Sequence, residues 1–538
     1  MHVAFAFLLA VAAVLRLFGL GWLPSPAGDE GNWTLYALRI LHGEPAALAP
    51  EASFVSLLYA RLIALSMSVL GPTFTAARLV GATAVLVAIV VVYLVLGWMG
   101  SWRAGLAAAA VVAVHPWAVF YARIASVPYG LAFALLLVGP VVFAAGVLRQ
   151  RMAMVGAGIL VTGVAIHFSP LSLVGAAACG LFLLHPSHRW VLRRPVTWIA
   201  GAITALHVAP VLLGAARVAE AAPDLPQIAS FWPHLFGYAH MTGTALMGEA
   251  TLRHFTSVAM PAAAATVLLV PLAVLAWLAV AGPAPPLLGR FAELYFAAGV
   301  VLSPLILAPG RNWFLPANHM DRYLFAVLPG LVLLAGEAAW RNRRVRTAAV
   351  VLLLGWLAVC TGRAAVAFLV GSGVDHGELI FDGGGGYRGW LVSDRPRATM
   401  MRIRDTVVRE AAGGPATVLV ADRVFIPLVF AMEGTGIPVF DVRRTQVPPR
   451  RGPYFVVLWP DAVLSIGHPP TAPPKYVESN RHLRDRMTRL FHRAAMVEAF
   501  RQRDGAPLLE IWRAEDPYPR LARAPAPPDD VTADESGR

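Results

Sequence analysis

The chain of 538 residues has few charged side chains, a single lysine (Lys475) and only two cysteines. Charged residues make up 14% of it, whereas a soluble globular domain carries about 25%. Together with a hydrophobic fraction of 58%, this excludes an ordinary soluble protein and predicts a membrane protein with a smaller soluble part. Cys179 and Cys360 both fall in apolar runs, which excludes a disulfide framework and predicts two small buried side chains.

The net charge of +13 is carried almost wholly by arginine. Most of these arginines lie in short loops between apolar runs, where they orient helices and do not build a basic face. We therefore expect no nucleic-acid partner. The sequence also has no Asp-x-Asp motif and no cluster of histidines and cysteines in the loops expected on the outer side, so we expect no metal and no cofactor.

Apolar runs that approach the roughly 20 residues of a spanning helix recur along positions 1–370. They predict a polytopic all-α transmembrane bundle of about eleven helices. The first run lacks a basic region before it and is therefore expected to be a retained span, not a cleaved signal. The expected spans are 3–20, 76–98, 104–120, 127–147, 154–166, 171–184, 196–213, 261–280, 291–307, 323–339 and 348–370.

Arginine-rich loops alternate with arginine-poor ones along this bundle. By the positive-inside rule the arginine-rich loops are cytoplasmic, so the loop 24–75 and everything after residue 370 are expected on the outer side of the plasma (inner) membrane. Within the loop, the apolar stretch 54–70 is interrupted by Arg61 and is expected to be an interfacial helix. The arginines of the inner loops are Arg149, Arg151, Arg189, Arg193, Arg194, Arg341, Arg343, Arg344 and Arg346.

After the last span the composition becomes that of a small soluble domain. A glycine-rich linker (371–396) is expected to lead into an extracytoplasmic α/β domain (397–521) and a disordered tail (522–538). No nucleophile or metal-binding constellation is visible in the domain. The expected helices are 397–411 and 424–432; the expected strands are 416–421, 437–442 and 454–459, followed by a hairpin of 496–503 and 508–512.

Two adjacent acids, Asp29 and Glu30, stand just beyond the first span. Charges at the edge of a bilayer are costly and usually face a cavity or a partner. The simpler interpretation is a solvated loop in which the acids cap the next helix, because aspartate favours a helix N-terminus.

The topology brings further polar residues to the same side of the membrane. Two carboxylates facing several guanidiniums suit a site that activates a nucleophile and holds an anion, because the planar arginine fork binds two phosphate oxygens at once. Taken singly, each arginine could instead be an interfacial anchor, and His167 a satisfied polar residue at a helix end. The converging residues are Arg16, Asp29, Glu30, Arg78, Arg123, His167, Arg311, His319, Asp321 and Arg322.

The order of these features resembles the C-type (GT-C) glycosyltransferases, in the branch of the protein O-mannosyltransferases and the transferases that add aminoarabinose to lipid A. The resemblance covers roughly residues 1–370. It departs from the family at Ala49-Pro50-Glu51-Ala52, where many relatives have a Lys/His-Pro-Pro turn, and at Val127-Pro128, where some have an acid. The matching motifs are Arg16-Leu17, Asp29-Glu30, Ile40-Leu41-His42-Gly43, Ala77-Arg78-Leu79, Tyr121-Ala122-Arg123, Pro128-Tyr129 and Arg322-Tyr323-Leu324.

The resemblance implies transfer of a sugar from a polyprenyl phosphate to a hydroxyl of a lipid, glycan or protein in the cell envelope. It implies Asp29 as the base and Glu30 as its catalytic partner. Two other classes stay open: a transporter or flippase of a lipid-linked anion, and an inactive scaffold that binds glycan through the C-terminal domain. The resemblance assigns the donor phosphate to Arg123, Arg322 and Arg78, and supporting roles to Arg16, His167, Tyr129 and Tyr323.

Overall fold

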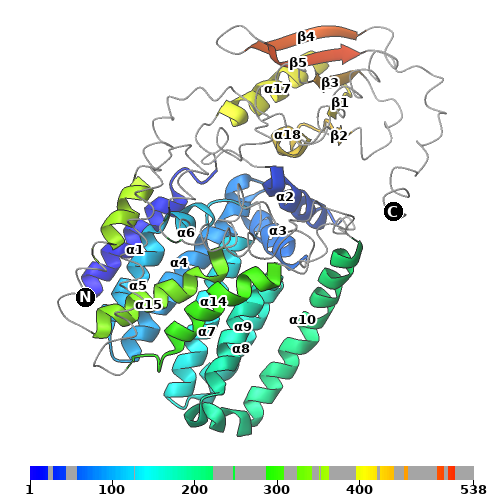
Figure 1. The fold of residues 1–538 in the computed structure, drawn as a ribbon. Coiled ribbons are helices and arrows are strands. Elements are labelled where there is room, and N and C mark those ends of the chain that lie inside the picture. Colours follow the sequence, from blue (N-terminus) through cyan, green and yellow to red (C-terminus); the bar gives the residue numbers. More distant parts are fainter. Residues whose placement is uncertain are drawn as a thin grey trace, which may run out of the picture.

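The structure, a computed structural model, is mostly helical, with a sheet near the C-terminus. The helical bundle lies below and the sheet-containing part above it, over the end of the bundle that carries α2 (Gly28–Leu41) and α3 (Leu58–Leu70) (Figure 1). The residues described are 1–21, 28–43, 57–125, 128–221, 246, 248, 286–307, 324–341, 351, 353–362, 395–420, 425–441, 453–458, 494–501 and 507–514. The expected linker and tail lie almost wholly outside them.

The first part of the bundle follows the apolar runs closely. α1 (His2–Leu17) and α4 (Phe74–Trp98) take the places of the first two expected spans, and α3 takes the place of the interfacial helix. α4 starts at a conventional cap, because the Thr73 hydroxyl accepts a hydrogen bond from the Ala76 N–H at 3.2 Å. α3 buries Tyr59, Ile63 and Met67 on one side and exposes Leu65, Val69 and Leu70 on another.

The expected span 104–120 is not one helix, and that prediction was wrong. It forms α5 (Trp102–Val114) and a short α6 (Pro116–Phe120), separated at His115. Pro116 has no N–H to continue α5, but it fits the first turn of a new helix. The His115 ring caps that turn, with Nδ1 accepting a hydrogen bond from the Trp117 N–H at 3.1 Å.

The two helices α7 (Tyr129–Leu148) and α8 (Met152–Ile166) pack with their backbones in close approach. A Cβ added at Gly139 or Gly146 of α7 would lie 2.7 Å from the backbone nitrogen of Thr162 or Val155 in α8. Glycine is therefore required at this seam, as is common where helices pack within a membrane.

Further helices of the bundle pack around this pair and on one another. Pro170–Leu183 and Pro186–Arg193 meet at an angle of 107°, so the chain turns sharply before α10. Glu337, 1% exposed, accepts hydrogen bonds from the Leu287 and Leu288 N–H groups at 3.0 and 2.6 Å, which ties α15 to the start of α14. These elements are η2 (Pro170–Ser172), α9 (Leu173–Leu183), η3 (Pro186–Arg193), α10 (Pro195–Ala221), α14 (Phe291–Leu307) and α15 (Leu328–Arg341).

Three of the described helices are long and apolar enough to cross a membrane, or up to four if the bent pair forms one span. They are Phe74–Trp98, Tyr129–Leu148 and Pro195–Gly214. The expectation of about eleven spans depends also on shorter apolar helices, such as His2–Leu17 and Trp102–Val114, and on 261–280, which lies outside the described residues.

The C-terminal part is a five-stranded mixed sheet in the order β2-β1-β3-β5-β4. β1 pairs in parallel with β2 and β3, and β5 pairs antiparallel with β3 and β4. The expected helices, strands and terminal hairpin are all present, with ends shifted by a few residues. The elements are α17 (Arg395–Ala411), β1 (Thr417–Val420), α18 (Phe425–Met432), β2 (Val439–Asp441), β3 (Tyr454–Leu458), β4 (Ala494–Arg501) and β5 (Pro507–Ala514).

A polar contact adds to the apolar packing between α17 and the sheet. Glu498 of β4 accepts hydrogen bonds from Thr406 and from Arg402, the latter at 2.8 Å, and Arg409 lies 3.8 Å away. Burial raises the pKa of Glu498, but these three partners outweigh it and hold the pKa below its ordinary value.

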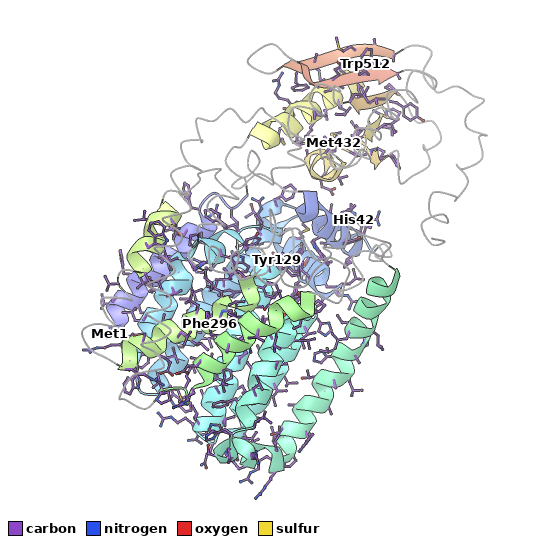
Figure 2. All side chains as sticks on the ribbon, in the orientation of Figure 1. Met1, His42, Tyr129, Phe296, Met432 and Trp512 are labelled. Carbon is purple, nitrogen blue, oxygen red and sulfur yellow. The ribbon has the colours of Figure 1, made fainter. Side chains whose placement is uncertain are left out.

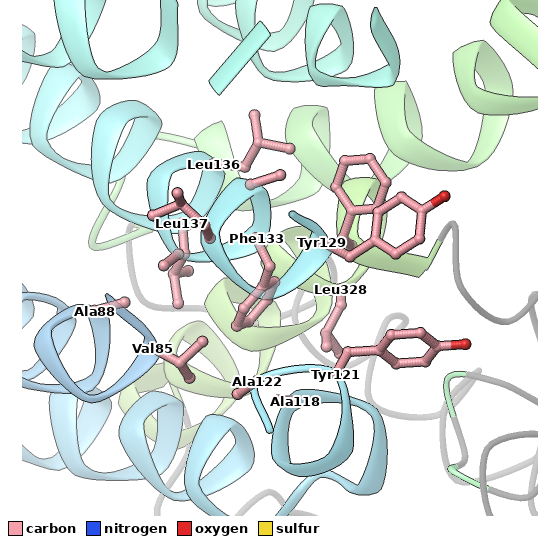
Figure 3. Close-up of a cluster of buried hydrophobic side chains, with 14 of the residues drawn as sticks. Val85, Ala88, Ala118, Tyr121, Ala122, Tyr129, Phe133, Leu136, Leu137 and Leu328 are labelled. Carbon is pink, nitrogen blue, oxygen red and sulfur yellow. The ribbon is translucent and has the colours of Figure 1, made fainter. Parts of the chain in front are cut away.

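A densely packed part of the core lies where α4, α6, α7 and α15 meet (Figure 3). Phe133 and Leu137 of α7 pack there with Val85 of α4 and Leu328 of α15, and all four are fully buried. This part of the core anchors the short turn between α6 and α7, which carries Arg123.

Candidate functional site

The acidic pair lies in the first turn of α2. The helix begins at Gly28, so Asp29 and Glu30 stand at a helix N-terminus, where negative charge is favoured. Their side chains are outside the described part of the structure. The position of the turn is fixed from further along α2, where Trp33, Ala37 and Leu38 are buried and the Trp33 ring meets Tyr59 of α3 edge-on at 5.4 Å.

Arg123 and Arg78 both reach the C-terminal end of α1. Arg123 donates to the carbonyl oxygens of Leu15 and Phe18 at 2.6 and 2.7 Å, and Arg78 donates to that of Leu20 at 2.9 Å. The last carbonyls of a helix lack partners within the helix and carry its negative partial charge, so the Arg123 guanidinium is well placed there. Leu20, which Arg78 binds, lies three residues beyond the last residue of α1. The side chains of Arg123 and Arg78 are both buried, at 6% and 0% exposed.

The turn that carries Arg123 is held between two glycines. A Cβ on Gly81 of α4 would lie 3.0 Å from the Ala122 carbonyl oxygen, and one on Gly130 of α7 would lie 2.8 Å from that of Tyr121. A side chain at either glycine would therefore collide with the backbone of the turn. Arg123 lies near Arg78 in this packed region. Burial and the neighbouring Arg78 charge lower the pKa of Arg123 to about 10, so Arg123 stays protonated at neutral pH.

Arg16 is also buried at this end of α1, but it faces the backbone of another helix pair. It donates to the carbonyls of Val112 and Ala113 at 2.6 and 3.1 Å, and to that of Ala118 at 3.3 Å. A further bond of 3.2 Å goes to Ala12 in its own helix. Arg16 thus ties α1 to the end of α5 and the start of α6.

His167 lies at the end of α8 and pairs with a residue that the sequence did not single out. Its Nε2 lies 2.7 Å from Nδ1 of His207 on α10, with the two rings stacked at 4.9 Å. The next residue, Phe168, meets Tyr59 of α3 edge-on at 6.3 Å. The aromatic contacts of Phe168 and Tyr59 thus link the end of α8, beside His167, to Trp33 of α2.

Tyr129 joins the Arg123 turn to the segment that follows Arg322 and Tyr323. Its ring stacks on Phe325 with the ring centroids 5.3 Å apart, and it meets Tyr121 edge-on with the centroids 6.0 Å apart. The hydroxyls of Tyr121 and Tyr129 point to the same side, away from the packed core (Figure 3). Arg322 and Tyr323 themselves lie outside the described residues, as do Arg311, His319 and Asp321.

The structure thus brings Arg16, Arg78 and Arg123 together around the end of α1. Tyr129 contacts the turn that carries Arg123, whereas His167 pairs with His207 on α10. Sequence reasoning missed His207, Tyr121 and the two glycines beside the turn. Tyr121 could have been found, because it stands in the Tyr-x-Arg motif. Within the described part of the chain, no three histidine, cysteine, aspartate or glutamate side chains gather in a way that could hold a metal ion.

The sequence matches no family model and no curated protein. The structure is similar to ArnT from Cupriavidus metallidurans bound to undecaprenyl phosphate, with a TM-score of 0.54 over 94% of this chain and 97% of that chain at 17% identity. The chain has the GT-C fold. The apo form of the same ArnT gives a TM-score of 0.52 at 16% identity over the same shares of both chains.

A zinc- and sulfate-bound oligosaccharyltransferase from Archaeoglobus fulgidus is a more distant neighbour, with a TM-score of 0.39 and 11% identity over 81% of this chain and 62% of that chain. The GT-C fold expected from the order of the motifs is confirmed. Because the similarity to ArnT extends over 94% of the chain, it includes the C-terminal sheet as well as the helical bundle.

Proposed function

We propose that the protein is a membrane glycosyltransferase that moves a sugar from a polyprenyl phosphate to an acceptor hydroxyl, without metal or cofactor. The observation that carries the proposal is the pair of buried guanidiniums, Arg78 and Arg123, at the end of α1 in a GT-C fold. Two neighbouring guanidiniums suit the oxygens of a phosphate, and the ArnT neighbour holds undecaprenyl phosphate. The site would face the outer side of the plasma membrane, in the cell envelope.

The reaction is a single inverting displacement. Asp29 removes the proton of the acceptor hydroxyl as its oxygen attacks the anomeric carbon from the face opposite the phosphate. The bond between the anomeric carbon and the phosphate oxygen breaks, and its electron pair leaves on that oxygen as polyprenyl phosphate. A phosphate is a stabilised leaving group, so no second carboxylic acid needs to protonate it, in contrast to the two-carboxylate hydrolysis of glycosides.

The other residues have positioning and electrostatic roles in this proposal. Glu30 orients Asp29 or the acceptor, and Arg123, Arg322 and Arg78 stabilise the charge that develops on the phosphate. Tyr129 and Tyr323 have supporting roles. Arg16 and His167 support the site from the ends of α1 and α8. The acceptor is a hydroxyl of a lipid, a glycan or a protein.

Asp29→Asn tests the proposal directly. The variant keeps the size of the side chain but loses the base, so transfer from a panel of polyprenyl-phosphate sugars should be abolished while binding of polyprenyl phosphate stays near wild type. Asp405→Asn, on the exposed surface of α17, is the matched control and should transfer normally. Normal transfer by Asp29→Asn would refute the assigned base. Movement of the lipid across vesicles without any transfer by the wild type would favour a flippase instead.

A further inference from the structure

The C-terminal domain meets the bundle through α18, which lies on α2 (Figure 1). Glu433, directly after α18, lies 3.8 Å from His42 at the end of α2. Figure 2 labels His42 on the bundle and Met432 on the other side of this boundary. The buried apolar side chains form one continuous cluster across this boundary, with Trp33 and Leu38 of α2 in the same group as Leu428 and Met432 of α18.

One side of α18 is turned toward α2. Val429 stands one helical turn before Glu433 and therefore shares the face of the helix that meets His42. It is half-buried and packs against the continuous cluster. The His42–Glu433 pair is itself partly exposed, at 50% and 30%, and such pairs contribute little. The apolar side chains of the continuous cluster, against which Val429 packs, are therefore expected to contribute more to the contact than this pair does.

α2 is thus held from two sides, by α3 at the bundle and by α18 at the C-terminal domain. The acidic pair stands in its first turn and His42 just after its last. A helix rises 1.5 Å per residue, so these two ends are about 20 Å apart, and a tilt of about 5° would move the acids by about 1.7 Å. A displacement of about 1 Å in a catalytic group can cost about a hundredfold in rate.

We propose that α18 is a positioning element of the transfer site. Val429 and Glu433 hold the C-terminal end of α2, and this contact sets where Asp29 stands relative to the acceptor. The proposal rests on the function proposed above. It assigns the C-terminal domain a part in the chemistry although none of its own residues touches substrate, and it predicts that the docked arrangement is the active one.

A reversible cross-link tests whether docking and activity go together. In the full-length chain, His42→Cys and Glu433→Cys would be joined by a short, reducible bis-thiosulfonate. Both natural cysteines are buried, so the two new thiols are the reactive pair among the described residues. The cross-linked enzyme should transfer sugar at the rate of its reduced form or faster. Loss of transfer on cross-linking, regained on reduction, would show that the domain must leave α2 and would overturn the proposal.

Val429→Arg tests the opposite case, in which the contact between α18 and α2 is weakened. We expect its kcat to fall at least tenfold with the KM for the donor unchanged, because the arginines at α1 are untouched. The same cross-link introduced into this variant should restore transfer, and reduction should remove it again. Val408→Arg, at an exposed position on α17, is the control and should behave as wild type.

An activity-independent measurement separates this proposal from the function on which it rests. In Val429→Arg, a thiol introduced as Asp29→Cys should react with a membrane-impermeant reagent at a changed rate, and cross-linking should return that rate to its original value. An unchanged rate would overturn the positioning role of α18, whatever the enzyme transfers. Absence of transfer by the wild type with a changed labelling rate would instead overturn the proposed function.

Discussion

Replacing Arg16 by methionine should destabilise the bundle far more than it affects the chemistry. Methionine retains most of the volume but none of the donors. Arg16 is completely buried, and its two best hydrogen bonds go to the carbonyls of Val112 and Ala113, at the end of α5, at 2.6 and 3.1 Å. These carbonyls have no partner within their helix, so they depend on the guanidinium.

The magnitude follows from these two bonds. Hydrogen bonds to a charged group contribute about 1.5–3 kcal/mol each, which gives about 3–6 kcal/mol for the pair. Part of this is offset because methionine also removes a buried charge that was costly to desolvate. We therefore expect Arg16→Met to lose about 2–4 kcal/mol of unfolding free energy. Arg16→Lys should recover part of it, because an ammonium group lacks the planar fork that serves two carbonyls at once.

The measurement is the free energy of unfolding by SDS titration in micelles, alongside the transfer rate per folded molecule. Arg103→Met is the matched control, because Arg103 lies on α5 but is exposed, and its stability should stay near wild type. An Arg16→Met protein that is as stable as wild type would refute this reasoning. If that stable variant were also at least tenfold slower in transfer, Arg16 would have to contact the donor.

Four further outcomes are expected. Arg123→Ala should slow transfer about ten- to hundredfold, the equivalent of one lost charge-assisted hydrogen bond of about 1.5–3 kcal/mol, and Arg123→Lys should restore part of the rate. Arg61→Ala, at an exposed position on α3, is the control. Normal transfer by Arg123→Ala together with slow transfer by Arg61→Ala would place the donor along α3. Transfer should survive EDTA, and a loss that a divalent ion restores would contradict this. Thiols introduced at positions 29 and 343 should be labelled from outside and inside intact cells respectively, and labelling of 343 from outside would invert the topology. Glu498→Gln should lower the thermal stability of the C-terminal domain above about pH 4.5 but not well below it, because a carboxylate with a lowered pKa stabilises the fold only while it is ionised. A stability difference between variant and wild type that does not change with pH would contradict the ion-pair interpretation.

Local patterns in the sequence were sufficient for the C-terminal domain. Its strands alternate or are wholly apolar, and Asp504-Gly505 lies between the two strands that form the antiparallel hairpin. The same local patterns failed at 104–120, because the apolar run continues through His115 and its hydropathy gives no sign that the helix ends there. The His-Pro pair was the local sign of that break, because proline fits the first turn of a helix and not its middle.

The site was predictable only in part. The arginines at the end of α1 could be grouped from topology, since the ends of neighbouring spans share a membrane face. Their partners could not, because the carbonyls that Arg16 and Arg123 bind in the described part of the chain are backbone groups and have no signature in the sequence. His207 was also missed, since a histidine within an apolar helix looks the same whether or not a second ring from α8 stacks on it.

The glycine seam between α7 and α8 has a consequence for biogenesis. The two helices are joined by only a short connection around Gln150, and their backbones approach closely at the glycines of the seam. Neighbouring segments of this kind can pair while the rest of the chain is still being synthesised, since their contacts need no later partner. The α7–α8 pair would then be the first stable helical pair in the bilayer. α14 and α15, which are synthesised much later, would pack onto helices that are already assembled.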